Sequence, residues 1–404
     1  MNAVFANSGI DRLRRDFALL TGGLLRRGMI ISLITAVFFV VNIGTIAGIA
    51  VTRDIAPVQD FFAFHAAAEV AAEGGAMAVS ELYDAEAFAS LFSEDRGMLW
   101  LYPPTMLLVM FPFGLISYGA AKTVWVIASC VLLAIAAYRI SNRNAYLTLA
   151  AMISPAAFAV LFTGQISVFF ACLALVGFLN AKTRPILAGI CFGLLTLKPQ
   201  FGLLVPVFLL CTGSWRAIIT ASVCAIALAL MSVAAFGNTS WLAFFGSLTA
   251  THTDFIVSYG HAGRITLADS FRILGWVNAS TALTTLISIG IGGGLIVWAQ
   301  RAGASMRMLA ALAMILTAVT APYFWTYDWV FVAFSVLLFL TDRQKLPLWT
   351  QAILVAVWFV PLSPYVGGSA TLVPIIWLVL LGATGAIASN LLGLTGRPLP
   401  RQAV

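Results

Sequence analysis

Asp60 is the residue of this sequence best placed to act as an acid or a base. It lies in the stretch 54–98, which holds nine of the chain's fifteen carboxylates, and the aromatic pair Phe61-Phe62 follows it directly. Keeping a carboxylate charged beside aromatic rings and lipid is costly, so such a group usually has a partner or a chemical task. Aspartate is also a favoured N-cap, and capping a helix over 61–73 explains Asp60 equally well.

Lys198 is a positive charge in the middle of apolar sequence, within Leu197-Lys198-Pro199-Gln200. A charge in such a place normally faces a cavity or a counter-ion, and an ammonium group there suits an anionic lipid head group. The alternative is that the side chain runs along the apolar surface and reaches water. The first interpretation predicts a contact with a phosphate.

Further charged candidates lie in two other segments. His261 and Arg264, within 251–272, are suited to meeting a phosphate, although solvated loop positions explain them equally well. Asp328 follows Pro322-Tyr323-Phe324-Trp325-Thr326-Tyr327 and begins an apolar run. Orienting an acceptor hydroxyl and capping the helix that follows are equal alternatives for this carboxylate.

Four uncharged side chains complete the set of candidate substrate contacts. Tyr102 precedes Pro103-Pro104 and Gln165 follows Gly164, so both suit either sugar binding or the ending of a helix. Gln200 lies two positions after Lys198, and Tyr327 directly precedes Asp328, so both are also candidate substrate contacts.

The composition is that of a polytopic membrane protein. Of 404 residues, 61% are hydrophobic and 9% are charged, and the mean hydropathy is +1.01. Apolar runs long enough to cross a hydrocarbon layer of roughly 30 Å recur along the chain, and they lack the alternation of barrel strands. The sequence therefore predicts an all-α membrane protein whose spans are helices.

The net charge of +7 comes from scattered pairs of basic residues, which argues against nucleic acid as a partner. The five cysteines lie within apolar runs and are expected to be small core residues. No nucleotide-binding loop, dinucleotide fingerprint or metal signature is present, so neither a metal nor another cofactor is expected.

Counting basic residues orients the chain. The expected arrangement is a basic cytoplasmic N-terminus (1–27), a single transmembrane domain (28–390) and a cytoplasmic tail (391–404). Within the domain, 52–98 and 237–276 are expected to be large periplasmic loops, the first carrying amphipathic helices over 60–73 and 84–94. This arrangement places sixteen of twenty-two Lys and Arg inside and twelve of fifteen Asp and Glu outside.

Twelve crossings are predicted, with 102–117 as a re-entrant segment entered from the outer face. The predicted spans are 28–51, 119–138, 145–162, 166–181, 185–197, 200–212, 217–236, 278–299, 307–321, 328–340, 347–360 and 371–390. A single kinked crossing over 185–212 is the main alternative for the short pair around Lys198. Because the turns with ionisable and aromatic residues fall on the outer side, the working site is expected to face the periplasm.

A series of short motifs appears in a characteristic order. They are Asp60-Phe61 with Phe64 and Ala67-Ala68, Leu82-Tyr83-Asp84, Tyr102-Pro103-Pro104 with Pro112, Gly164-Gln165-Ile166-Ser167, Leu197-Lys198-Pro199-Gln200, and Pro322 with Tyr327-Asp328. Over roughly 28–345 this order resembles glycosyltransferase family 87, a group of integral membrane enzymes with a GT-C-like helical bundle. Two positions depart from many relatives: Phe64 stands where Tyr is common, and no His precedes Tyr327-Asp328.

The resemblance implies a membrane glycosyltransferase. It would move a hexose, with mannose as the expected sugar, from a polyprenyl-phosphate donor to a glycolipid or glycan acceptor in the bacterial inner membrane. Asp60 would be the general base of an inverting displacement, and Lys198, with Arg264, would meet the donor phosphate. A lipid-linked sugar flippase or small-solute transporter and a non-catalytic envelope scaffold are the competing classes. The absence of a visible repeat disfavours a transporter.

Overall fold

The computed structural model describes residues 60–92, 99–258, 280–341 and 348–362, and single positions 33, 36, 37, 40, 266, 271 and 384. Side chains are described to residue 248 in the second range and from 351 in the last. Nearly all of the predicted spans 28–51 and 371–390, and the termini 1–27 and 391–404, lie outside these residues. The described part is helical throughout and contains no strand, which confirms the all-α prediction.

The described residues form nineteen helical elements, α-helices and short 3-10 turns. In chain order they are α2 (Phe61–Glu73), α3 (Gly75–Glu81), α4 (Ala85–Ser90), α5 (Thr105–Gly114), α6 (Tyr118–Ile140), α7 (Ala145–Met152), α8 (Pro155–Thr163), α9 (Ser167–Asn180), α10 (Pro185–Leu194), η1 (Leu195–Leu197), η2 (Pro199–Gly202), α11 (Val205–Cys211), α12 (Trp215–Ser258), α14 (Thr281–Arg301), α15 (Met306–Thr320), η3 (Thr326–Trp329), α16 (Val330–Leu340), α17 (Leu348–Trp358) and η4 (Val360–Leu362). Several ends fall close to the predicted ones, because Pro, Gly and Ser mark them in the sequence. The predicted span 145–162 is instead two helices, and α12 continues past its predicted end at 236.

Three of these helices are long and apolar enough to cross a membrane: α6, α14 and the Trp215–Leu248 part of α12. The pair α7 and α8 makes a fourth candidate if it forms one span, bent by 46° where Ser154 caps α8 and Pro155 begins it. The other apolar helices have 10–17 residues. Three or four candidate spans are therefore shown in the described residues, and the total of twelve stays a prediction.

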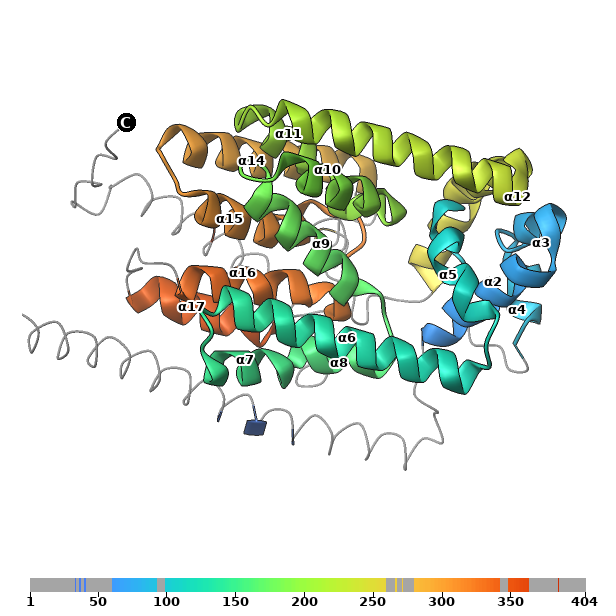
Figure 1. The fold of residues 1–404 in the computed structure, drawn as a ribbon, viewed down its shortest axis with the longest axis horizontal. Helices are drawn as coiled ribbons and strands as arrows, with labels where there is room; N and C mark the ends of the chain where they lie inside the picture. Colours follow the sequence, from blue (N-terminus) through green and yellow to red (C-terminus); the bar gives the residue numbers. More distant parts are fainter. Residues whose placement is uncertain are drawn as a thin grey trace, which may run out of the picture.

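The first four described helices gather at one end of the structure. In Figure 1, α6 and α12 run along the long axis, and α2, α3, α4 and α5 lie together at the right-hand end. Gly237 interrupts α12 with φ 74° and ψ 164°. Helix continues beyond it to Ser258, so the segment predicted as the second outer loop begins with a helix that packs on α3.

Helix α5 folds back onto α2 instead of running away from it. Its 10 residues span about 15 Å, half of the hydrocarbon layer, so this helix alone is too short to cross, and entry of 102–117 from the outer face stays a prediction. The two helices touch through backbone, because a Cβ on Gly114 would lie 2.2 Å from the Ala68 carbonyl oxygen. His65 Nε2 and the Ile116 carbonyl oxygen, 3.0 Å apart, join the same pair of segments.

Gly114→Ala is expected to destabilise the protein by about 1–3 kcal/mol, because the added methyl group must push α5 away from the α2 backbone. The thermal unfolding midpoint in detergent measures the loss. Gly119→Ala is the matched control: nothing lies within 4 Å of its Cβ position in α6, so its midpoint should not fall. Equal midpoints for the two variants would contradict the close packing of α2 and α5.

The turns predicted to be cytoplasmic meet at one end of the bundle. The Arg307 guanidinium donates hydrogen bonds to the Ile140 carbonyl and to the Thr341 hydroxyl. Asn142 donates from its side-chain amide to the Thr341 carbonyl at 3.0 Å. The ends of α6 and α16 and the start of α15 are therefore joined there, as the charge pattern predicts.

Candidate active site

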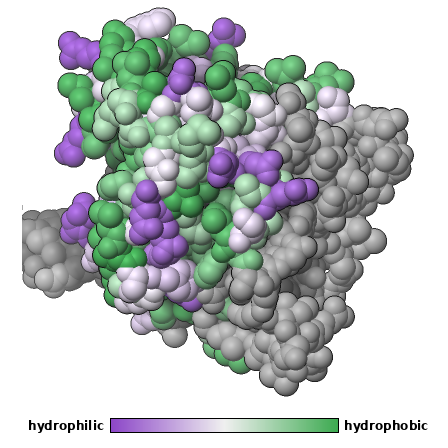
Figure 2. All heavy atoms as spheres, turned by 90° about the vertical axis from the view of Figure 1, so that its right-hand side faces the viewer, coloured by the Kyte–Doolittle hydropathy of each residue, from purple (hydrophilic) through white to green (hydrophobic). Residues whose placement is uncertain are grey.

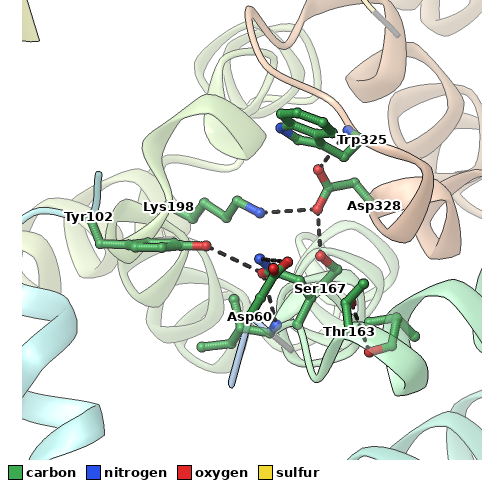
Figure 3. Close-up of polar contacts among 10 residues, drawn as sticks. Asp60, Tyr102, Thr163, Ser167, Lys198, Trp325 and Asp328 are labelled. Atoms are coloured by element: carbon green, nitrogen blue, oxygen red, sulfur yellow. Dashed lines mark hydrogen bonds and ion pairs between the residues drawn. The ribbon is translucent and has the colours of Figure 1, made fainter. Parts of the chain in front are cut away.

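Asp60 stands at the start of α2, but its side chain does not cap that helix. Its Oδ2 instead accepts a hydrogen bond of 2.7 Å from Gln165 Nε2, a residue 105 positions later in the chain. Figure 3 shows Asp60 among the polar contacts of this site. The capping explanation of Asp60 is therefore wrong, since a donor from another segment holds the carboxylate.

Asp60 also differs from the other acids of the first loop. Glu69, Glu73, Glu81, Asp84 and Glu86 are all exposed, whereas Asp60 is partly buried. Figure 2 looks onto this end of the molecule and shows hydrophilic residues scattered over the surface among hydrophobic ones. Among the carboxylates described in the loop, Asp60 alone is withdrawn from solvent.

Gly164 brings the end of α8 against the start of α2. It has a left-handed backbone (φ 72°, ψ 26°), and a Cβ there would lie 2.6 Å from the Phe61 Cβ. The Trp125 indole N–H donates to the Gly164 carbonyl at 2.8 Å and fixes the turn. Only glycine allows both this conformation and this close approach.

The turn delivers the Gln165 side chain to Asp60 in a defined orientation. Gln165 Oε1 accepts hydrogen bonds from the Tyr102 hydroxyl and from its neighbour's backbone, Ile166 N–H, each at 3.3 Å. Since the carbonyl end is occupied by donors, the amide nitrogen faces the Asp60 carboxylate.

Lys198 lies between the short helices η1 and η2, where Pro199 ends the first and begins the second. Its side chain is 4% exposed, and Nζ lies 3.0 Å from Asp328 Oδ1. The ring centroids of Phe201, Tyr327 and Tyr102 lie 4.5, 5.6 and 5.9 Å from Nζ. The alternative in which Lys198 extends to the surface is wrong.

Asp328 is completely buried, and both of its oxygens have partners. Oδ1 pairs with Lys198 and accepts a hydrogen bond from the Ser167 hydroxyl. Oδ2 accepts from the Trp325 backbone N–H at 3.0 Å, which caps the turn at η3. The capping role expected for Asp328 is thus present, together with an ion pair.

The charges of this cluster act on one another. Burial raises the pKa of Asp60 to about 6, while the Gln165 hydrogen bond and the positive charge of Lys198 oppose that rise. The negative charge of Asp328 adds to it. A carboxyl group with a pKa of about 6 can exchange a proton near neutral pH.

Some predicted residues do not join the cluster. Gln200 is half-buried in η2, and no hydrogen bond connects it with the described site residues. His261 and Arg264 lie outside the described residues. Ser167 and Trp325 were missed, although Ser167 ends the motif 164–167 and Trp325 precedes Tyr327-Asp328.

Two further features bear on the site: possible metal ligands and cavities. Within the described ranges, no group of three His, Cys, Asp or Glu side chains comes together that could hold a metal ion. Two small cavities lie away from Asp60, one between α14 and the end of α15 and the other between α16 and α17.

The comparisons with known proteins give one match. The sequence model described as Glycosyltransferase family 87 matches residues 100–325, more than half of the chain. The chain belongs to glycosyltransferase family 87. No curated protein and no solved structure matches it.

Membership of family 87 makes this chain a membrane glycosyltransferase. The matched residues include Tyr102, Gln165 and Lys198, whereas Asp60 and Asp328 lie outside them. The match is shorter than the resemblance over 28–345 that the motifs suggest. The structure nevertheless joins both carboxylates to matched residues, Asp60 through Gln165 and Asp328 through Lys198.

Proposed function

We propose that this glycosyltransferase moves a hexose, with mannose as the expected sugar, from a polyprenyl-phosphate donor to a hydroxyl of a glycolipid or glycan acceptor. The reaction takes place at the periplasmic face of a bacterial inner membrane, and both chain termini are cytoplasmic. The observation that supports this most is a withdrawn carboxylate, Asp60, held by Gln165 close enough to Lys198 for the two charges to interact.

The proposed reaction is one displacement with inversion. Asp60 takes the proton of the acceptor hydroxyl while the hydroxyl oxygen bonds to the anomeric carbon of the sugar. The bond between that carbon and the phosphate oxygen breaks on the opposite face, and its electron pair leaves with the phosphate. Lys198 offsets the negative charge that develops there, and Arg264 is proposed to assist.

The hydrogen bonds around Asp60 suit this role. Gln165 occupies Oδ2, and no hydrogen bond from a described residue reaches Oδ1. Oδ1 is therefore the oxygen that receives the proton. The Tyr102 hydroxyl donates a hydrogen bond to the carbonyl oxygen of the Gln165 amide. The amide is therefore fixed in orientation, and it fixes the orientation of the Asp60 carboxylate in turn.

The rate of transfer is expected to rise with pH through about 6. A general base must be ionised, and because burial raises the pKa of Asp60 to about 6, the base is lost by protonation below that value. The measurement is kcat/KM for the acceptor over about pH 4.5–8. A profile without an acidic limb in this range would contradict the assignment of Asp60.

Reconstitution tests the proposal as a whole. Purified protein in proteoliposomes is given radiolabelled polyprenyl-phosphate hexoses, mannose first, with lipid extract of the native membrane as the acceptor source. The expected result is a labelled glycolipid or glycan whose new bond has the anomeric configuration opposite to that of the donor. Movement of the donor across the bilayer without a glycosylated product would favour a flippase, and neither outcome would favour a scaffold.

A further inference from the structure

Asp328 is not placed to contact a substrate directly. The side chain is fully buried, and its two oxygens accept from Lys198, Ser167 and the Trp325 backbone. A residue that contacts a sugar needs exposed surface or an open hydrogen-bonding position. The function of Asp328 must therefore be exerted through the residues that it holds.

The charged residue that Asp328 holds is Lys198. A lysine side chain is long and flexible, and a buried ammonium group without a counter-ion is strongly disfavoured. Asp328 supplies the counter-ion, and the rings of Tyr102, Phe201 and Tyr327 surround the ammonium group. The cation is consequently fixed in position before any donor binds.

One three-residue stretch connects this cation to the base. Gln165 donates to Asp60, and Ser167, two positions later, donates to Asp328. The path Asp60, Gln165, Ser167, Asp328, Lys198 is therefore continuous, and Figure 3 shows these polar contacts gathered in one place. The spacing of base and cation is set by the backbone between Gln165 and Ser167.

We propose that Asp328 is a positioning residue which, with Ser167, holds the Lys198 ammonium group at a fixed place relative to Asp60, where the donor phosphate departs. The proposal rests on the proposed function. It differs from a role for Asp328 in orienting the acceptor, because Asp328 then acts only through Lys198.

The charged and titratable groups around Asp60 affect its pKa, so a change in this arrangement is expected to alter the pH dependence of transfer. Four such groups among the described residues face Asp60. Lys198 lies at the junction of η1 and η2, Asp328 and the Tyr327 phenol lie in η3, and the Tyr102 phenol lies in the segment before α5. Lys198 lowers the pKa of Asp60 and Asp328 raises it. Removing either charge should move the acidic limb of the profile, in opposite directions.

A double-mutant cycle with Lys198→Gln and Asp328→Asn tests the proposal. Transfer is measured with the polyprenyl-phosphate hexose that the wild type uses. We expect Asp328→Asn to lower kcat by about 10²-fold through misplacement of the cation, and Lys198→Gln to lower it by about 10²- to 10³-fold. In the Lys198→Gln background, Asp328→Asn should cause no further loss. Equal losses in both backgrounds, or no loss in the single variant, would overturn the proposal.

The pH profile separates positioning from a general loss of structure. The acidic limb should move to lower pH in Asp328→Asn and to higher pH in Lys198→Gln, because each variant removes one charge near Asp60. Ser167→Ala removes a hydrogen bond and no charge, so kcat should fall by about tenfold with the limb unmoved. Lys182→Gln makes the same change at an exposed lysine and should leave both kcat and the limb unchanged.

The role of Asp328 can still be tested if the Asp328→Asn protein does not fold. If Asp328→Asn fails to elute as a single species in detergent, Ser167→Ala replaces it in the cycle. A loss in the wild-type background that disappears in the Lys198→Gln background supports the proposal, and equal losses overturn it. Failure of the proposed function looks different, since the wild type would then form no glycosylated product, and failure of the base assignment alone would leave near-normal transfer in Asp60→Asn.

Discussion

Asp60→Asn is expected to lower kcat by about 10²- to 10⁴-fold while the protein remains folded. Asparagine has the same shape, and its carbonyl oxygen can still accept the hydrogen bond from Gln165. It cannot take a proton from the acceptor hydroxyl at neutral pH. Transfer of labelled hexose by purified wild type and variant measures the loss, and thermal unfolding confirms that the fold is kept.

Asp84→Asn is the matched control for this prediction. Asp84 lies in the same loop, is exposed, and caps α4 by accepting from the Ala87 N–H at 2.9 Å. Asparagine caps a helix as well as aspartate, so both stability and transfer should be close to wild type. Near-normal transfer by Asp60→Asn, or a comparable loss in Asp84→Asn, would refute the assignment of Asp60 as the base.

Gly164→Ala is expected to damage both stability and activity. The left-handed backbone costs alanine about 1–2 kcal/mol, and the methyl group, 2.6 Å from the Phe61 Cβ, adds about 1–3 kcal/mol of overpacking. Relief requires α2 to move, and Asp60 stands at the start of α2. A displacement of about 1 Å at a reacting group can reduce turnover by about 10²-fold.

Unfolding midpoints and kcat of the same preparations test this prediction. Gly290→Ala is a suitable control, because it is the same change at a glycine inside α14, where nothing lies within 4 Å of the Cβ position. A Gly164→Ala protein with wild-type turnover would show that the contact between α8 and α2 does not position Asp60.

The sequence predicts well those features that depend on neighbours in the chain. Pro185 and Pro199 mark helix starts, and the structure begins α10 and η2 there, whereas the predicted span 145–162 is broken at Pro155 into α7 and α8. Charge counting also places the segments of Asp60, Gln165, Lys198 and Asp328 on one side, and the structure joins them in one cluster. That side is predicted to be the periplasmic one.

The pairing of these side chains could not be read from the sequence. Lys198 and Asp328 are 130 residues apart, and only the packing of η1, η2 and η3 reveals that each is the counter-ion of the other. The capping rule failed at Asp60 for the same reason, because a distant amide outcompeted the local backbone. Local propensity does not report such competition.

The two carboxylates flank the region by which the family is recognised, and both are held by side chains within it. A match to the family model and the presence of both carboxylates are consequently separate properties of a sequence. A homologue can match this region, with Gln165, Ser167 and Lys198, and still lack the acid equivalent to Asp60; if Asp60 is the base as proposed, such a homologue would be a pseudoenzyme. Gene sets assembled from a match to the middle of the chain should therefore be sorted by the acids on either side of it, as a test of the proposed role of Asp60.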